Sequence, residues 1–106
     1  MEMVGEEYLN MQEHLLYITE LIVKRMASLS KVKGVMAEWG ELENTAYIAF
    51  YFDDQPTENE LEDASDACGE IIAHCSNALL HEDYIRLESP LPESPFWAYK
   101  RPENFK

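Results

Sequence analysis

The side chains best suited to chemistry in this chain are carboxylates that gather in one short segment. Residues 51–70, "YFDDQPTENELEDASDACGE", include eight Asp or Glu and no Lys or Arg. Such an array can bind a divalent cation, attract a cationic macromolecule or keep a surface hydrated. Because like charges one helical turn apart repel each other, a concentration of this kind needs an explanation.

A bound metal ion is the first possibility, and the sequence disfavours it. The acids alternate as in a calcium-binding loop, but the segment lacks the EF-hand order, with its central Gly and its Glu at the twelfth position. Elsewhere His74 stands beside Cys75, yet adjacent residues of a helix point about 100° apart and do not chelate one ion together. We therefore expect no metal ligands and no cofactor.

Nucleophilic catalysis is disfavoured as well. Both cysteines, Cys68 and Cys75, fall on the apolar stripe of a predicted helix, where a thiol has no exposed base beside it. Two helical turns separate them by about 10 Å, which is too far for a disulfide. The chain contains no GxSxG, no glycine-rich phosphate loop and no HExxH motif. We expect no enzymatic activity.

The net charge restricts the class of partner. The chain has 106 residues and a formal charge of −13, and residues 34–85 include thirteen Asp or Glu but no Lys or Arg. Such a surface repels nucleic acids and anionic lipid head groups, whereas it attracts basic proteins and speeds their encounter. The apolar runs are far shorter than the roughly 20 residues of a membrane span, and the N-terminus has no cationic segment typical of a signal peptide. We therefore expect a cytoplasmic protein that binds neither nucleic acid nor membrane.

Hydrophobic periodicity predicts the elements that position these groups. Helices are expected over residues 6–28 and 57–75, and strands over residues 31–40, 45–52, 83–89 and 96–101. The order α-β-β-α-β-β predicts a single α+β domain, residues 1–106. We expect a mostly antiparallel four-stranded sheet with two helices packed on one face.

Three local details sharpen this prediction. Residues 45–52, "TAYIAFYF", should form a central strand that is covered on both faces, because nearly all its residues are apolar. Thr57, followed by Glu60, fits a capping box at the start of the second helix. In the third strand, Ile85 and Leu87 should point inward.

Aromatic residues lie mostly on the predicted strands, where most of them should belong to the core. On the sheet face away from the helices they would be partly exposed. Tyr and Trp in such a position would suit the centre of a protein interface. Which aromatic residues are exposed depends on the strand order.

Carboxylates of the second predicted helix recur every four residues and therefore form a row on its solvent side. The helix dipole favours anions in the first turn by about 0.3–1 kcal/mol, but this effect fades beyond that turn. Two interpretations remain for the later acids: a hydrated face, or a docking surface for a cationic protein. The row consists of Glu58, Glu62, Asp66 and Glu70, with Asp63 close by and Asp53 and Asp54 before the helix.

Two segments of the chain carry a family resemblance. "YIAFYFDDQPTENELEDASDACGEIIAH" and "YIRLESPLPESPFWAYKRPE" resemble small bacterial immunity proteins that accompany contact-dependent growth inhibition toxins and related polymorphic toxins. The shared pattern is an apolar strand ending in "FYFD", a Pro-Thr step, an acidic helix and a tail similar to "LPxSPFWAYRR". The resemblance covers the chain from Tyr47 onward. It implies a cytoplasmic protein that binds the toxin domain of a sister cell, frequently a cationic nuclease, and blocks its active site or a neighbouring surface.

The leading hypothesis is a non-enzymatic immunity protein that neutralises a cognate toxin with a basic domain. A nuclease needs a positive cleft to hold phosphates, and a carboxylate array complements such a cleft. The alternative is an acidic regulatory or assembly subunit that docks on a basic protein without any toxin. The expected partner-binding residues are Asp53, Asp54, Glu58, Glu62, Asp63 and Asp66, and the next candidates are Glu38, Glu41 and Glu43 around the first hairpin.

Overall fold

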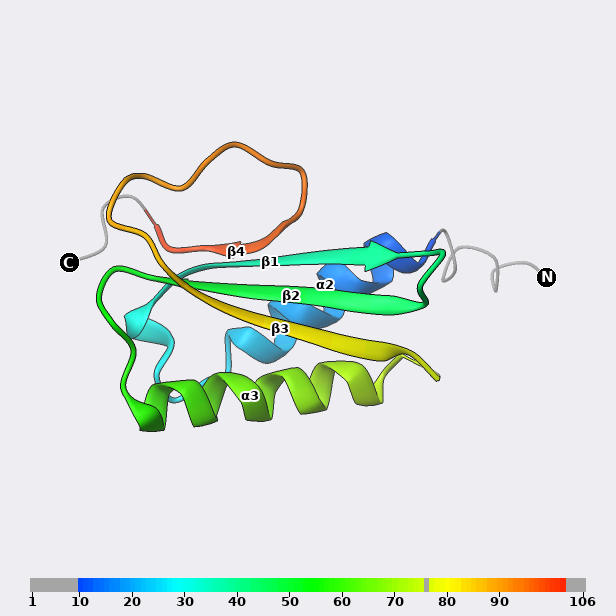
Figure 1. Cartoon of the computed structure of the whole chain (residues 1–106), viewed down its shortest axis with the longest axis horizontal. Helices are drawn as coiled ribbons and strands as arrows, with labels where there is room; N and C mark the ends of the chain where they lie inside the picture. The colour runs from blue at the N-terminus through cyan, green and yellow to red at the C-terminus, as the bar shows by residue number, and fades with distance from the viewer. Residues whose placement is uncertain (1–9, 76, 103–106) are drawn as a thin grey trace.

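The computed structural model describes residues 10–75 and 77–102, which form two α-helices and a four-stranded sheet (Figure 1). The predicted α+β class is confirmed, together with the order of its helices and strands. The helices in this described part include none that is long and apolar enough to cross a lipid bilayer. The elements are α2 (Met11–Val23), the 3₁₀-helix η1 (Leu29–Lys31), β1 (Val32–Gly40), β2 (Thr45–Phe52), α3 (Glu58–Ala73), β3 (Leu79–Arg86) and β4 (Trp97–Lys100).

The strands lie in the order β3-β2-β1-β4. β1 pairs antiparallel with β2, through the turn at residues 41–44, and antiparallel with β4, whereas β2 and β3 run parallel. The parallel pair arises because α3 carries the chain back along the sheet before β3 begins, and parallel strands require such a crossover. The sheet is therefore mixed, although most of its pairings are antiparallel as predicted.

Both helices pack on the same face of the sheet, α2 against β1 and β4, and α3 against β2 and β3. Small residues on the inner side of α3, Ala64, Ala67 and Cys68, are buried and let this helix lie close to the strands. The core therefore forms a single layer between the helices and the sheet. Its largest fully buried side chains are Phe50, Phe52, Leu15, Ile48 and Ile71.

The opposite face of β2 is only partly covered, so the prediction that this strand is covered on both faces is wrong. Tyr47 is 36% exposed, and Tyr51 on the same face is half-buried. The reason is that both helices lie on the other side. Among the described residues, the loop at residues 87–96 and Trp97 of β4 reach this face. Leu91 lies against Gly34, and the Trp97 ring lies 5.2 Å from the Tyr51 ring between centroids.

The capping box predicted at the start of α3 is confirmed. The Thr57 hydroxyl accepts a hydrogen bond of 3.1 Å from the Glu60 backbone N–H, and the Glu60 carboxylate accepts one of 3.0 Å from the Thr57 N–H. These two bonds satisfy backbone donors that have no partner inside the helix. They fix the point where the chain turns from β2 into the acidic helix.

The first helix is shorter than predicted. The prediction covered residues 6–28, of which residues 6–9 lie outside the described part of the chain. Asn10 caps α2 by accepting a hydrogen bond of 2.7 Å from the Glu13 N–H, and the helix ends at Val23. The chain then turns towards η1, with Ser28 at its start held by a contact to α3.

The third strand begins four residues earlier than predicted, at Leu79, and the inward residues differ. Leu80 and Tyr84 pack against the core, whereas the prediction placed Ile85 and Leu87 there. The parallel register is the reason, because it sets Tyr84 opposite Phe50 with ring centroids 5.9 Å apart. An amphipathic Tyr can occupy this position because the Tyr84 hydroxyl donates a hydrogen bond to the Glu82 carboxylate.

A bulge in β1 explains why its apolar residues do not alternate strictly. Val32 and Val35 are three residues apart, yet both are fully buried. The register against β2 shifts between Val32 and Gly34, which places both valines on the helix side of the sheet. From Val35 onward the strand alternates, with Val35, Ala37 and Trp39 on the helix side.

Candidate functional site

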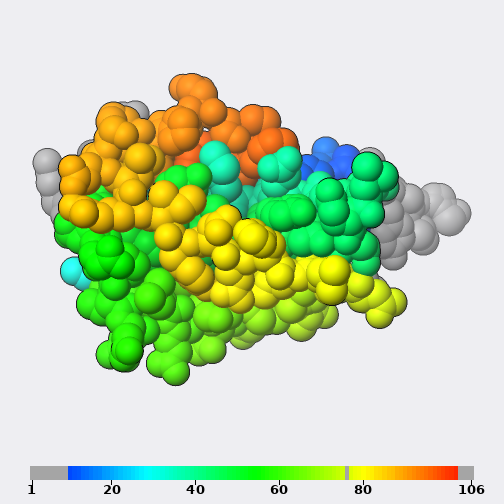
Figure 2. All heavy atoms as spheres, viewed as in Figure 1, coloured from blue at the N-terminus to red at the C-terminus, as the bar shows by residue number. Residues whose placement is uncertain are grey.

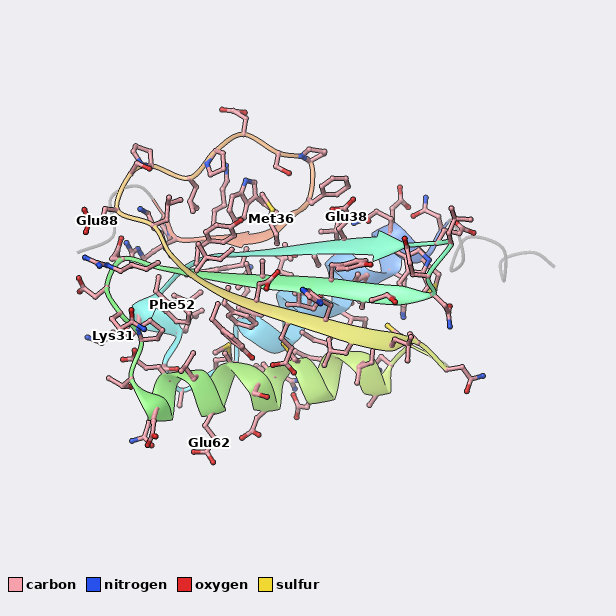
Figure 3. All side chains as sticks on the ribbon, in the orientation of Figure 1. Lys31, Met36, Glu38, Phe52, Glu62 and Glu88 are labelled. Carbon is pink, nitrogen blue, oxygen red and sulfur yellow. The ribbon has the colours of Figure 1, made fainter. Side chains whose placement is uncertain are left out.

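The six carboxylates predicted to bind a partner lie at one end of β2 and along α3. Asp53 and Asp54 occupy the bend after β2, and the other four lie on the helix. Figure 3 shows Glu62 extending from the side of α3 that points away from the sheet. The structure thus brings the six residues onto neighbouring elements, but their immediate surroundings differ.

Asp53 is matched by cations of the chain itself. Its carboxylate lies 2.5 Å from Arg101 Nη2 and 3.5 Å from Lys33 Nζ. The hydrogen bond from Arg101 is the main cause that holds the pKa of Asp53 below its usual value, and the charges of Arg101 and Lys33 act in the same direction. The carboxylate therefore ties the end of β2 to β1 and to the residue that follows β4.

Asp63 also has an internal partner. One of its oxygens accepts two hydrogen bonds from Ser28, of 2.9 Å from the backbone N–H and 2.6 Å from the hydroxyl. These bonds join α3 to the connection between α2 and β1. Nearby, Arg25 and Glu70 form an ion pair of 3.9 Å between well exposed side chains, which contributes little in water.

The remaining four carboxylates are exposed and uncompensated. In the part of the chain that the structure describes, their side chains take part in no hydrogen bond or ion pair. Their charges extend into solvent along α3 and the bend before it. Lys31 and Arg101 line a hollow together with Asp54, and Arg25 lines another together with Asp66. This surface, called here the α3 acidic face, consists of Asp54, Glu58, Glu62 and Asp66.

The groups that could hold a metal or act as nucleophiles are arranged for neither role. Among residues 10–75 and 77–102, no three His, Cys, Asp or Glu side chains lie close enough together to hold an ion. Cys68 is fully buried, and desolvation raises the pKa of its thiol to about 12. Burial also raises the pKa of Cys75. Burial therefore disfavours, in both residues, the thiolate that nucleophilic chemistry needs.

A second surface lies on the sheet, on the face away from the helices, and sequence reasoning did not place it. In cross-strand rows, Tyr47 pairs with Glu38 on one side and His81 on the other, and Ala49 pairs with Met36 and Asp83. The alternation of side chains along β2 places Tyr47 and Ala49 on one face, and the strand order determines their neighbours. This surface, called the open sheet face, consists of Met36, Glu38, Tyr47, Ala49, His81 and Asp83.

Contacts within the open sheet face order its polar groups. The rings of Tyr47 and His81 lie with their centroids 5.4 Å apart, and His81 Nε2 is 3.2 Å from an Asp83 oxygen. The loop at residues 87–96 closes only the end near Gly34, where Trp97 Nε1 donates a hydrogen bond of 2.8 Å to the Pro92 carbonyl. The end around Tyr47 remains open to solvent.

Comparison with known proteins identifies the family. The family model described as MafI2 immunity protein matches residues 27–103, which is more than half of the chain and includes all four described strands and α3. A search of the curated proteins gives no match. On the strength of the family match, the chain belongs to the MafI2 immunity protein family.

Proposed function

We propose that this protein protects a bacterial cytoplasm by binding a cognate toxin domain and neutralising it, without catalysing a reaction. Membership of an immunity protein family is the main support. The toxin would belong to a contact-dependent or related polymorphic system, as the resemblance of the C-terminal segments implies. A protein of this kind works by occupying its target at one copy per toxin molecule.

The observation that carries the choice of surface is the uncompensated charge of the α3 acidic face. Four exposed carboxylates that form no ion pair with a described residue give a negative field that would attract a basic toxin domain. Such a field raises the rate of encounter more than it slows dissociation. The partner is therefore proposed to be cationic, as a nuclease that holds phosphates must be.

Asp53 and Asp63 are also proposed to contact the toxin, but we expect them to contribute less to its attraction than the other four carboxylates. Both lie beside the α3 acidic face, but one is neutralised by Arg101 and Lys33 and the other is held by Ser28. Their replacement would disturb the fold as well as the field. The test of the surface therefore uses the other four.

The experiment measures association of the chain with a catalytically inactivated domain of the candidate cognate toxin. Stopped-flow rates are compared at low and at physiological salt for the wild type and for the variant D54N/E58Q/E62Q/D66N. We expect the variant's association rate constant at low salt to fall about tenfold or more, with little remaining salt dependence. An unchanged rate would exclude this face as the docking surface.

A matched control separates the position of the charges from their number. The variant E13Q/E20Q/E88Q/E93Q removes the same number of charges from other elements. It should retain most of the wild-type association rate. If both variants lose the rate equally, net charge alone drives the encounter; if the wild type does not bind the toxin domain at any salt, the proposed immunity function is wrong.

A further inference from the structure

We propose that the open sheet face forms the centre of the toxin interface and receives an Arg or Lys side chain of the toxin over Ala49, between Tyr47 and Asp83. This proposal rests on the immunity function proposed above. The immunity proposal assigns the first encounter to the α3 acidic face. The further proposal is that the open sheet face then holds the toxin, through an Arg or Lys side chain that the toxin inserts.

The composition of this face supports an interface, because outward positions of a sheet with one solvated face are ordinarily polar. Here β1 and β2 direct Met36, Tyr47 and Tyr51 outward, and β3 directs Ile85 to the same side. Protein interfaces are enriched in Tyr, Trp and Met at their centre, whereas Glu38, His81 and Asp83 form the polar part of this face. Among the described residues, neither helix covers these side chains.

The position over Ala49 is suited to a long cationic side chain. Ala49 projects a single methyl group, whereas its neighbours on the same face, Met36, Tyr47, Tyr51 and Asp83, are all longer. An incoming side chain would therefore lie among longer ones. The Tyr47 ring packs over Gly40 and beside the His81 ring, and its exposed part can make a cation–π contact with a guanidinium or ammonium group.

The charges around this position favour a cation. Glu38 is exposed beside Tyr47 in β1, and the Asp83 side chain is 56% exposed in β3. Lys33 of β1 pairs with Asp53 at the other end of the strand, and His81 lies 3.2 Å from Asp83. Glu38 forms no ion pair or hydrogen bond through its side chain among the described residues. The carboxylates would pair with an inserted Arg or Lys as water leaves the interface, where such pairs are strongest.

The α3 acidic face is less suited to this role. It consists of carboxylates alone, and taking several like charges out of water costs more than their partners return unless each is matched. Figure 2 shows β3 between α3 and the β1–β2 hairpin on one side of the molecule, so one partner can touch both surfaces. In this proposal the α3 acidic face raises the association rate of the toxin, and the open sheet face lowers its dissociation rate.

The experiment measures dissociation of the inactivated toxin domain by biolayer interferometry. The variant Y47A removes the aromatic ring, and A49K places a cation where the toxin's cation is expected. A matched control, Y17A, truncates a tyrosine that is 61% exposed on α2. We expect Y47A to raise the dissociation rate constant about tenfold or more and A49K to weaken binding about a hundredfold, with Y17A unchanged.

Separate outcomes test the two proposals. If the wild type binds the toxin domain while Y47A and A49K dissociate at the wild-type rate, the open sheet face is not the interface and the immunity function stands. If the wild type does not bind, both proposals fail. Circular dichroism checks that each variant folds. D83K changes an exposed side chain and should give the same loss as A49K, so the result does not depend on Y47A folding.

Discussion

The Asp53 carboxylate accepts a hydrogen bond of 2.5 Å from Arg101, a residue 48 positions further along the chain. Lys33 also pairs with Asp53 and donates hydrogen bonds to the carbonyls of Leu87 and Ser89. These contacts connect the start of β1, the end of β2, the residue after β4 and the loop after β3. Two cations from distant parts of the chain therefore pair with Asp53, the first acid of the segment 51–70. Asp53 therefore stabilises the fold of the unbound protein through its pairs with Lys33 and Arg101.

Replacement of Asp53 should lower stability in a pH-dependent way. The pKa of this carboxyl is lowered in the folded state from 3.8, so its contribution is complete above that value and is lost as pH falls through the folded pKa. We expect D53N to lower the free energy of unfolding by about 1 kcal/mol at neutral pH, a modest figure because water screens a partly exposed pair. Urea unfolding from pH 7 down to about pH 3 measures this difference, which should shrink below about pH 4.

The neighbouring acid provides the control for this prediction. Asp54 is exposed and its side chain has no hydrogen bond or ion pair with any described residue. D54N should change the free energy of unfolding by less than about 0.5 kcal/mol. Equal effects of D53N and D54N would contradict a structural role for the Arg101 contact.

The capping box of α3 should be measurable in stability. T57A removes the hydroxyl that accepts from the Glu60 N–H, and we expect it to lower the free energy of unfolding by about 1 kcal/mol. T57S keeps the hydroxyl and should stay within a few tenths of a kcal/mol of the wild type. Chemical denaturation compares the two variants, and similar losses in both would mean that the cap contributes nothing.

Two glycines should respond to alanine in opposite directions. A Cβ at Gly34 would lie 2.8 Å from Leu91 Cδ1 and 3.2 Å from the Tyr99 carbonyl oxygen, whereas nothing lies within 4 Å at Gly69. We expect G34A to lower the melting temperature, through a cost of about 1–3 kcal/mol from overpacking. G69A should raise it, through a gain of about 0.5–1 kcal/mol from helix propensity.

Thermal denaturation followed by circular dichroism tests both glycines in one series. A neutral G34A would mean that the loop carrying Leu91 does not rest on the sheet as the structure has it. A destabilising G69A would mean that the outer side of α3 contacts other parts of the chain.

The cysteines should be unreactive in the folded protein. Burial raises the pKa of Cys68 to about 12 and also raises that of Cys75, so the thiolate fraction of Cys68 at pH 8 is on the order of one in ten thousand. Ellman's reagent should react slowly with both thiols in the native state and rapidly in guanidinium chloride. Rapid reaction of one thiol in the native protein would reopen the possibility of nucleophilic chemistry.

Local signals were sufficient to predict the elements of this fold. The aromatic and β-branched residues at positions 45–52 predicted β2, and Thr57 with Glu60 predicted the start of α3. Such patterns depend on neighbours in sequence, which is why they transfer directly to local structure. The acidic row on α3 follows in the same way, because its four-residue spacing places Glu58 and Glu62 on one side of the helix.

The features that periodicity missed depend on contacts between distant segments. The parallel pairing of β2 and β3 sets which residues of β3 face the core, and it replaced Ile85 by Tyr84. The partners of Asp53 come from β1 and from beyond β4, so its neutralisation could not be predicted from the surrounding acids. The open sheet face likewise exists only once three strands are side by side.

Neutralisation of a toxin is tested most directly by the survival of bacteria that express the candidate cognate toxin domain together with increasing, quantified amounts of this protein. We predict complete survival once the protein reaches about one copy per toxin molecule, because protection by binding requires equal numbers of both partners. Death at every dose of folded protein would contradict the immunity function. Full protection far below equal numbers would contradict neutralisation by binding and indicate a catalytic activity.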